Sequence, residues 1–145
     1  MTIDNSIDVF LRADSTLAVS LGYIAASVGP PVIAEVPARI YWIKALDLAV
    51  VPYLVYQMVD DTDLMISFSQ KNTGQARFQF AVVSADRGGK TIQLRIRTLL
   101  RNYVGQLGTG GVTVVYVEPN MLMERFNADT NRFVFTVDYR LSYEY

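Results

Sequence analysis

The residues whose types and spacing come nearest to a known chemistry lie in the segment Ser84-Ala-Asp-Arg-Gly-Gly-Lys90-Thr91, between an expected strand and an expected helix. The segment nearly matches the loop G-x4-G-K-[ST], whose backbone N–H groups cradle phosphates while its lysine contacts them. Ser84 stands where the first glycine belongs, and a Cβ there interferes with the turn that aims those N–H groups. We therefore favour a strand-to-helix turn, and a small nucleotide-binding protein that uses Lys90 and Thr91 is the minor alternative.

A second group is acidic: Asp60, Asp61 and Asp63 follow one another closely, and Asp47 lies upstream. A calcium loop also needs a glycine at its bend and a distal glutamate, and neither occurs in this segment. We interpret the three aspartates as a solvated turn at the end of a strand. Spacing alone identifies no pair of carboxylates for general acid–base catalysis.

The chain contains no histidine and no cysteine. Their absence excludes disulfides, thiol nucleophiles and Ser-His or Cys-His pairs, together with the usual zinc and copper ligand sets. We predict neither a metal site nor a cofactor, and we predict that the chain is not an enzyme. The lack of cysteine also suits a reducing compartment.

The basic residues concentrate around the second expected helix, at Arg87, Lys90, Arg95, Arg97 and Arg101. Aromatic side chains are not interleaved with them, as a platform for single-stranded nucleic acid would require. The formal net charge of −1 also gives no electrostatic footprint for general nucleic-acid binding. Because arginine is favoured at protein interfaces, we prefer a subunit contact here, with a solvated helix face as the alternative.

Length and composition indicate one globular domain spanning residues 1–145. Apolar residues make up 51% of the chain and charged residues 19%, the balance of a folded chain. The N-terminus has acids from Asp4 and no basic n-region, and a run of about 18 apolar residues is absent. We therefore expect a soluble protein with no signal peptide and no membrane partner. A net charge near zero mildly favours self-association.

The clearest structural pattern is an alternation in the last stretch, Arg132 to Tyr145. One parity is apolar and rich in aromatic residues: Phe133, Phe135, Val137, Tyr139, Leu141, Tyr143 and Tyr145. The other parity is polar apart from Val134. Because side chains alternate across a strand, this pattern predicts a long strand with one greasy face that another layer must cover. We interpret its tyrosines as ordinary core, with burial against another copy as the alternative.

Two helices are expected, over residues 3–28 and 90–107, because apolar residues recur there at steps of three and four. The first stops before Gly29-Pro30-Pro31 and either packs on the sheet or serves as an arm that docks on a neighbouring subunit. Strands are expected over residues 38–43, 53–59, 64–69, 76–83, 112–117 and 121–126, with breaks at Asp60–Asp63, Gln70–Gln75 and Glu118–Asn120. This order predicts an α+β fold: a mostly antiparallel sheet with two helices packed on one side and a C-terminal β-hairpin.

Some of these elements carry recognisable residues. Arg39-Ile40-Tyr41 precedes Pro52-Tyr53-Leu54-Val55-Tyr56, and the polar-faced strand Arg77–Val83 and the expected helix Lys90–Leu107 follow before the closing hairpin. This order resembles the tail terminator (tail-completion) proteins of tailed bacteriophages, the group of the lambda minor tail protein U. The likeness spans nearly the whole chain, but the apolar segment Val28–Pro37 has no counterpart in it.

The resemblance implies a structural virion protein that caps the phage tail tube as a hexameric ring, ends tail polymerisation and offers a docking surface to the head connector. The implied partners are copies of itself, the tail-tube protein and a head-completion or connector protein, with DNA only as cargo passing through the ring. The implied location is the tail and neck of the virion, and the host cytoplasm during assembly. Another neck or head–tail joining protein, or a tail-tube subunit, is the alternative. The expected contact residues are Asp60, Asp61, Asp63, Lys71, Asn72, Arg87, Lys90, Arg95, Arg97 and Arg101.

Overall fold

A six-stranded sheet of order β1-β2-β3-β6-β5-β4 carries the fold in the computed structural model, which describes residues 2–45, 49–64 and 73–145. The described strands are β1 (Ile40–Trp42), β2 (Tyr53–Leu64), β3 (Thr73–Ser84), β4 (Gly105–Gln106), β5 (Thr113–Asn127) and β6 (Arg132–Glu144). The described helices are α1 (Ile3–Ala13), α2 (Ser15–Ser20) and α3 (Gly89–Leu100). Only β1 and β2 pair in parallel, and the other neighbours are antiparallel. The predicted α+β class and the closing hairpin, β5–β6, are confirmed.

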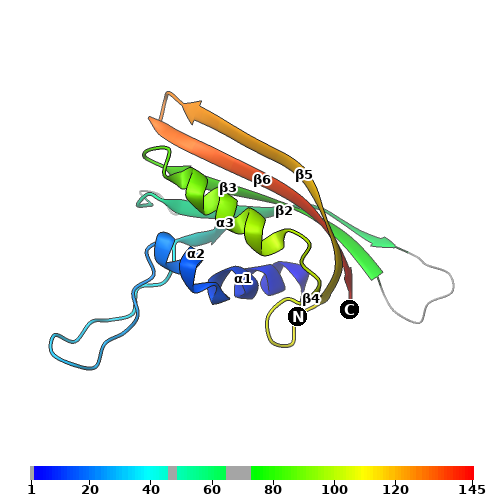
Figure 1. Cartoon of the computed structure of the whole chain (residues 1–145), viewed down its shortest axis with the longest axis horizontal. Helices are drawn as coiled ribbons and strands as arrows, with labels where there is room; N and C mark the ends of the chain where they lie inside the picture. The colour runs from blue at the N-terminus through cyan, green and yellow to red at the C-terminus, as the bar shows by residue number, and fades with distance from the viewer. Residues whose placement is uncertain (1, 46–48, 65–72) are drawn as a thin grey trace.

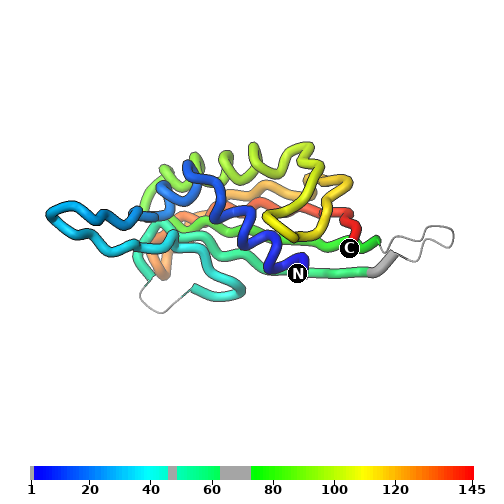
Figure 2. Tube along the Cα trace, turned by 90° about the horizontal axis from the view of Figure 1, so that it is seen from below, coloured from blue at the N-terminus to red at the C-terminus, as the bar shows by residue number. Residues whose placement is uncertain are grey.

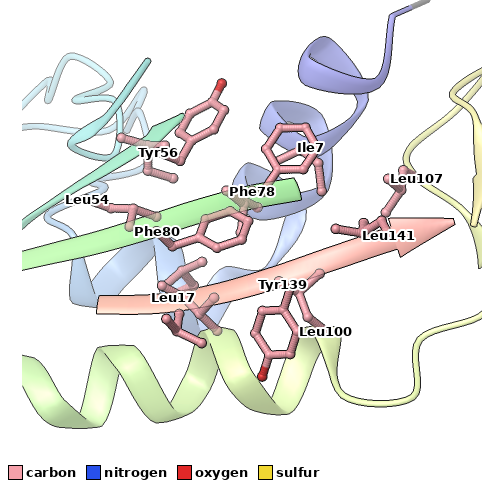
Figure 3. Packing of buried hydrophobic residues seen from close by; sticks show 14 of the residues in the cluster. Ile7, Leu17, Leu54, Tyr56, Phe78, Phe80, Leu100, Leu107, Tyr139 and Leu141 are labelled. Atoms are coloured by element: carbon pink, nitrogen blue, oxygen red, sulfur yellow. The ribbon is translucent and has the colours of Figure 1, made fainter. Parts of the chain in front are cut away.

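The described helices all lie on one face of the sheet, and none of them covers the other face, hereafter the open face (Figures 1 and 2). The predicted apolar face of β6 is confirmed, because it meets this helix layer: Phe135, Val137, Tyr139, Leu141 and Tyr143 are buried. The predicted wet face is wrong in part, since Thr136 and Asp138 are also buried. From α1 and α3, Ile7 and Leu100 point into the same core as Phe78 of β3 (Figure 3). Burial of this apolar surface is the main force that holds helices to sheet.

The predicted first helix is wrong in its extent, because α1 and α2 are separate and the helical part ends at Ser20. Asp14 separates them: its carboxylate accepts a hydrogen bond from the Leu17 N–H at 2.7 Å and so caps α2. Gly22 then takes a φ of +85°, a left-handed conformation that suits glycine and ends the helix.

Residues 24–36, hereafter the arm, replace the last part of that predicted helix with a narrow hairpin. Two isolated bridges close it, Ile24 to Val36 and Ser27 to Ile33, each with a hydrogen bond in both directions. Figure 1 shows the arm projecting away from the body of the molecule beyond α2. The apolar residues at the end of the predicted stripe therefore lie on this projection and outside the core.

The second predicted helix is too long, since α3 ends at Leu100 and not at Leu107. Asn102 has a φ of +58°, a left-handed conformation that asparagine tolerates better than most residues and that stops the helix. The apolar positions beyond this point still serve the core, because Leu107 is fully buried and Tyr103 meets Phe10 edge to face at 4.7 Å.

The acidic turn predicted after residue 59 is wrong, because β2 continues through these residues to Leu64. A register shift between Met58 and Asp60 absorbs one residue, and Asp60 then lies opposite Arg77 on β3. Opposite charges across two strands are favourable, so the acidic residues need not end the strand. The predicted strand 64–69 and turn 70–75 lie mostly outside the described residues; residues 73–75 belong to β3.

The predicted break at Glu118–Asn120 is also wrong, because β5 runs without interruption from Thr113 to Asn127. The pairing with β6 shifts register between Pro119 and Met121. Within the described chain β4 pairs with β5 only at Thr113 and Val114, so the rest of β5 is an edge. Proline is tolerated on such an edge, where its missing N–H costs no ladder bond.

Candidate interaction surfaces

Arg95, one of the predicted contact residues, holds α3 against α2. Its guanidinium donates to both carboxylate oxygens of Asp14, with Nη2–Oδ2 at 2.6 Å and Nε–Oδ1 at 3.1 Å. The hydrogen bond from Arg95 lowers the pKa of Asp14, and the Leu17 N–H adds to this effect, while partial burial opposes it. The Asp14 carboxylate therefore caps α2 and binds α3 at the same time.

The structure brings Arg87 and Lys90 together at one acidic residue of the neighbouring strand, Glu124 of β5. Lys90 Nζ lies 3.4 Å from Glu124 Oε2, and Arg87 Nε lies 3.9 Å from Oε1. All three side chains are exposed, so each pair contributes at most about 1 kcal/mol. In this conformation Lys90 points toward β5, and the loop before α3 has the Asp86 carboxylate accepting the Gly88 N–H at 2.8 Å.

Arg97 and Arg101 differ from the other arginines of this group, because neither forms an ion pair within the described part of the chain. Both side chains are exposed. They lie near Tyr139 of β6, whose pKa is raised by burial and partly lowered again by the two arginines. These two cations are thus available to a partner in a way that Arg95 is not.

Arg97 borders a shallow groove of about 170 Å³ between α3 and β5, hereafter the β5 groove. Its other lining residues are Pro119, Asn120, Met121 and Leu122 of β5 with Val137 and Tyr139 of β6. Val137 and Tyr139 are buried and form an apolar floor, whereas Leu122 is 48% exposed at the rim. The groove thus combines an apolar floor with two polar side chains, Arg97 and Asn120.

The rest of β5 is apolar on both faces, because Leu122 pairs with Val137 on the helix-covered face whereas Met123 pairs with Thr136 on the other. The strand exposes Tyr116, Leu122, Met123 and Phe126, more large apolar side chains than one strand of a globular domain usually exposes. Among the described residues no strand pairs with its outer edge beyond Val114. An uncovered edge with apolar side chains is a template on which another chain can pair.

The arm is the second apolar surface. Val28 is fully exposed and Val32 is 80% exposed, and Ile24 and Ile33 are also accessible. Glu35 is the one charged residue in the sequence of the arm. The tube view in Figure 2 shows that the arm stands clear of both the helices and the sheet. The prediction that Ile24 and Val28 belong to a core helix is wrong, and the adjacent Gly29-Pro30-Pro31 indicates a turn at this point.

The open face of the sheet contains a polar group that the sequence pattern missed. Asp138, predicted to face water, is fully buried and accepts three hydrogen bonds from Arg77, the shortest from Nη2 at 2.6 Å. The Asn120 side chain donates to the same carboxylate at 3.3 Å. The carboxylate in turn raises the pKa of Arg77. Gln79, and not Arg77, lies directly opposite Asp138, so the arginine reaches the carboxylate diagonally across β3 and β6. The sequence pattern alone therefore carries no signal for this pair.

The predicted acidic contact residues do not converge on one point. Asp60 lies opposite Arg77, whereas Asp61 is on the other face and accepts a hydrogen bond from the Tyr143 hydroxyl at 2.8 Å. Asp63 lies in β2, and its side chain is outside the described part of the structure. Lys71 and Asn72 lie outside the described residues altogether. Their role in a contact stays a prediction.

Two further properties bear on function. Among the residues that the structure describes, no three acidic side chains gather where they could hold a metal ion. None of the described helices has the length and apolar character needed to cross a membrane.

These features define an α+β protein whose sheet is covered by helices on one face and has apolar surfaces at an edge strand and on a projecting arm. No protein-family model matches the sequence, and no curated protein matches it either. The structure is similar to a chain in the solved structure titled "Virion of native gene transfer agent (GTA) particle", with a TM-score of 0.63 over 99% of this chain and 95% of that chain. The two sequences are 14% identical, so the likeness establishes a shared fold.

Proposed function

We propose that this chain is a structural protein of a phage-like virion that caps the tail tube as a ring and ends tail polymerisation. The observation that carries the proposal is the nearly full-length likeness to a chain of a gene transfer agent virion. The resemblance of the element order to tail terminator proteins supports the more specific role. A shared fold does not by itself establish a shared function. The proposal therefore also requires that the surfaces of this chain suit assembly.

The surfaces do suit assembly. A ring forms when one patch of each copy binds a different patch of the next, and closure needs no catalytic group. This chain has two such unlike patches, the arm and the β5 edge, both exposed and apolar. In the proposed ring the remaining surface contacts the tail-tube protein on one side and a head-completion or connector protein on the other, and DNA passes through the centre. The proposed site of action is the tail and neck of the virion.

The experiment is assembly of tails in the presence and absence of this chain. With the chain omitted, we expect tail tubes of irregular, excessive length that do not join heads. Adding the purified chain should restore tubes of one length, and electron microscopy should find it at the end of the tube. Light scattering should find a hexamer, either in solution or after binding to tubes.

Three results would contradict the proposal. The first is tubes of normal length without the chain, and the second is a chain that stays monomeric in solution and in the particle. The third is polymerisation of the purified chain into open-ended tubes, which would indicate a tail-tube subunit.

A further inference from the structure

We propose that the arm of one copy docks into the β5 groove of a second copy, with Glu35 of the arm facing Arg97 beside the groove. The proposal rests on the proposed function, because it names the contact by which copies join. It assigns a role to a segment that the resemblance to tail terminators leaves unmatched.

The arm has the properties of a docking element. Val28 and Val32 expose nearly all of their side chains, so burying them on a partner removes apolar surface from water. The paired hydrogen bonds between Ile24 and Val36 and between Ser27 and Ile33 hold the arm in one shape before it binds. A preformed element loses less conformational entropy on docking than a disordered one.

The β5 groove has the properties of the matching site. Its floor is apolar, and its rim carries Leu122, whose side chain is 48% exposed. Arg97 is the one charged residue that lines it. An apolar segment with a single acidic residue therefore matches this groove in both polarity and charge sign.

The charges also favour docking of the arm on the second copy's groove over docking on the second copy's arm. Two arms that packed against each other would bring two copies of Glu35 close together, and like charges oppose such a contact. Pairing of Glu35 with Arg97 instead satisfies an exposed arginine that has no ion pair among the described residues.

The positions of the two surfaces make the contact intermolecular. The arm joins the body next to β1, where the Arg39 N–H bonds to the Leu21 carbonyl at 2.9 Å. The β5 groove lies at the opposite side of the sheet, four strands away from β1 in the order β1-β2-β3-β6-β5. Figure 1 shows the arm and the middle of β5 well apart in the same molecule. Contact between unlike patches at opposite edges is head-to-tail, as a ring requires.

The first test uses the absence of cysteine from the chain, which makes two introduced thiols the only ones present. The variants Val32→Cys and Leu122→Cys, one carrying a size tag, are mixed and oxidised. We expect a mixed disulfide dimer, because a disulfide forms only when the two Cα atoms come within roughly 7 Å. The matched control replaces Leu122→Cys with Val59→Cys on β2, since both parent residues are 48% exposed, and it should give little product.

The second test is a charge exchange read by sedimentation velocity and by the same cross-link. Glu35→Arg and Arg97→Glu should each weaken association by roughly fivefold, the effect of losing one exposed ion pair. The double variant should recover most of the loss. Val32→Asp should abolish association, whereas Val104→Asp, a control at a residue 69% exposed on the loop after α3, should leave it unchanged.

Three outcomes would overturn the inference: arm-to-arm dimers in place of the mixed dimer, equal cross-linking of the control pair, or charge effects that simply add in the double variant. Tail assembly by the same variants separates the two proposals. If wild-type chain caps tails but the arm variants associate and cap normally, this inference falls and the proposed function stands. If the mixed dimer forms and wild-type chain caps no tail, the proposed function falls and the contact stands.

Discussion

Arg95 of α3 and Asp14, the residue between α1 and α2, are joined by two hydrogen bonds, the shorter at 2.6 Å. The pair ties the junction of α1 and α2 to α3, the helix that packs on the central strands β3 and β6. Because the same carboxylate caps α2, one side chain determines both where α2 begins and where it is placed. The arm follows directly after α2, so this pair also fixes the base from which the arm projects.

The first prediction separates the two roles of Asp14. We expect Asp14→Ala to lower the free energy of unfolding by about 2 kcal/mol, because the helix cap and the ion pair are each worth about 1 kcal/mol. Asp14→Asn should lose only the ion-pair part, since asparagine also caps helices well. Urea denaturation of the two variants measures the difference. Equal losses in both variants would show that the cap contributes nothing.

The second prediction concerns pH. The pKa of Asp14 in the folded chain is lowered from its ordinary value of 3.8, so the unfolded chain binds this proton more readily. The contribution of Asp14 to stability is therefore fully present above 3.8 and is lost as the pH falls through the lower folded value. In a stability-versus-pH series, the gap between wild type and Asp14→Asn should be constant near neutrality and should close in acid. A gap that widened in acid would reverse the sign and contradict the assignment.

The third prediction concerns the pair on the open face of the sheet. Arg77→Met leaves the fully buried Asp138 carboxylate without its main partner and should cost about 3 kcal/mol. The double variant Arg77→Met, Asp138→Leu should recover most of this loss, because replacing both charges with apolar groups removes the unpaired charge. Chemical unfolding of the singles and the double forms a double-mutant cycle. Additive effects in that cycle would mean that the two residues are not coupled.

How much of this fold is visible in the sequence depends on the range of the interactions that decide each element. The alternation in β6 and the apolar spacing of Ile92, Ile96 and Leu100 are local signals, and the structure buries those residues as predicted. The class, the closing hairpin and the helix-covered face follow from such patterns. The same spacing makes both predicted helices too long, because left-handed residues at Gly22 and Asn102 end them earlier.

The features missed at the candidate interaction surfaces depend on contacts distant in the sequence. Asp60 can sit inside a strand because Arg77 lies opposite it, and Asp138 can be buried because the same arginine reaches it. Neither pairing is readable without the strand register. The arm was missed for another reason. Ile24 and Val28 continue the helical spacing of apolar residues, although α2 has already ended at Ser20.

The fourth prediction concerns Gly89, the first residue of α3, in the loop that resembles a phosphate-binding motif. A Cβ built there would lie 2.6 Å from the Ser84 Cβ and 2.9 Å from the Phe135 ring, closer than real contacts allow. Gly89→Ala should therefore lower the free energy of unfolding by about 1–3 kcal/mol, although alanine favours helix more than glycine does.

The control for this change is Gly29→Ala in the arm, where an added Cβ has no neighbour within 4 Å and where stability should change by at most about 0.5 kcal/mol. The comparison also bears on the minor alternative for this loop. Close packing of α3 on β3 and β6 is a sufficient reason for glycine at this position, so the near-match to a phosphate loop requires no nucleotide. If Gly89→Ala left unfolding unchanged and instead removed a measurable affinity for ATP, that packing explanation would be wrong and the nucleotide-binding alternative would gain support.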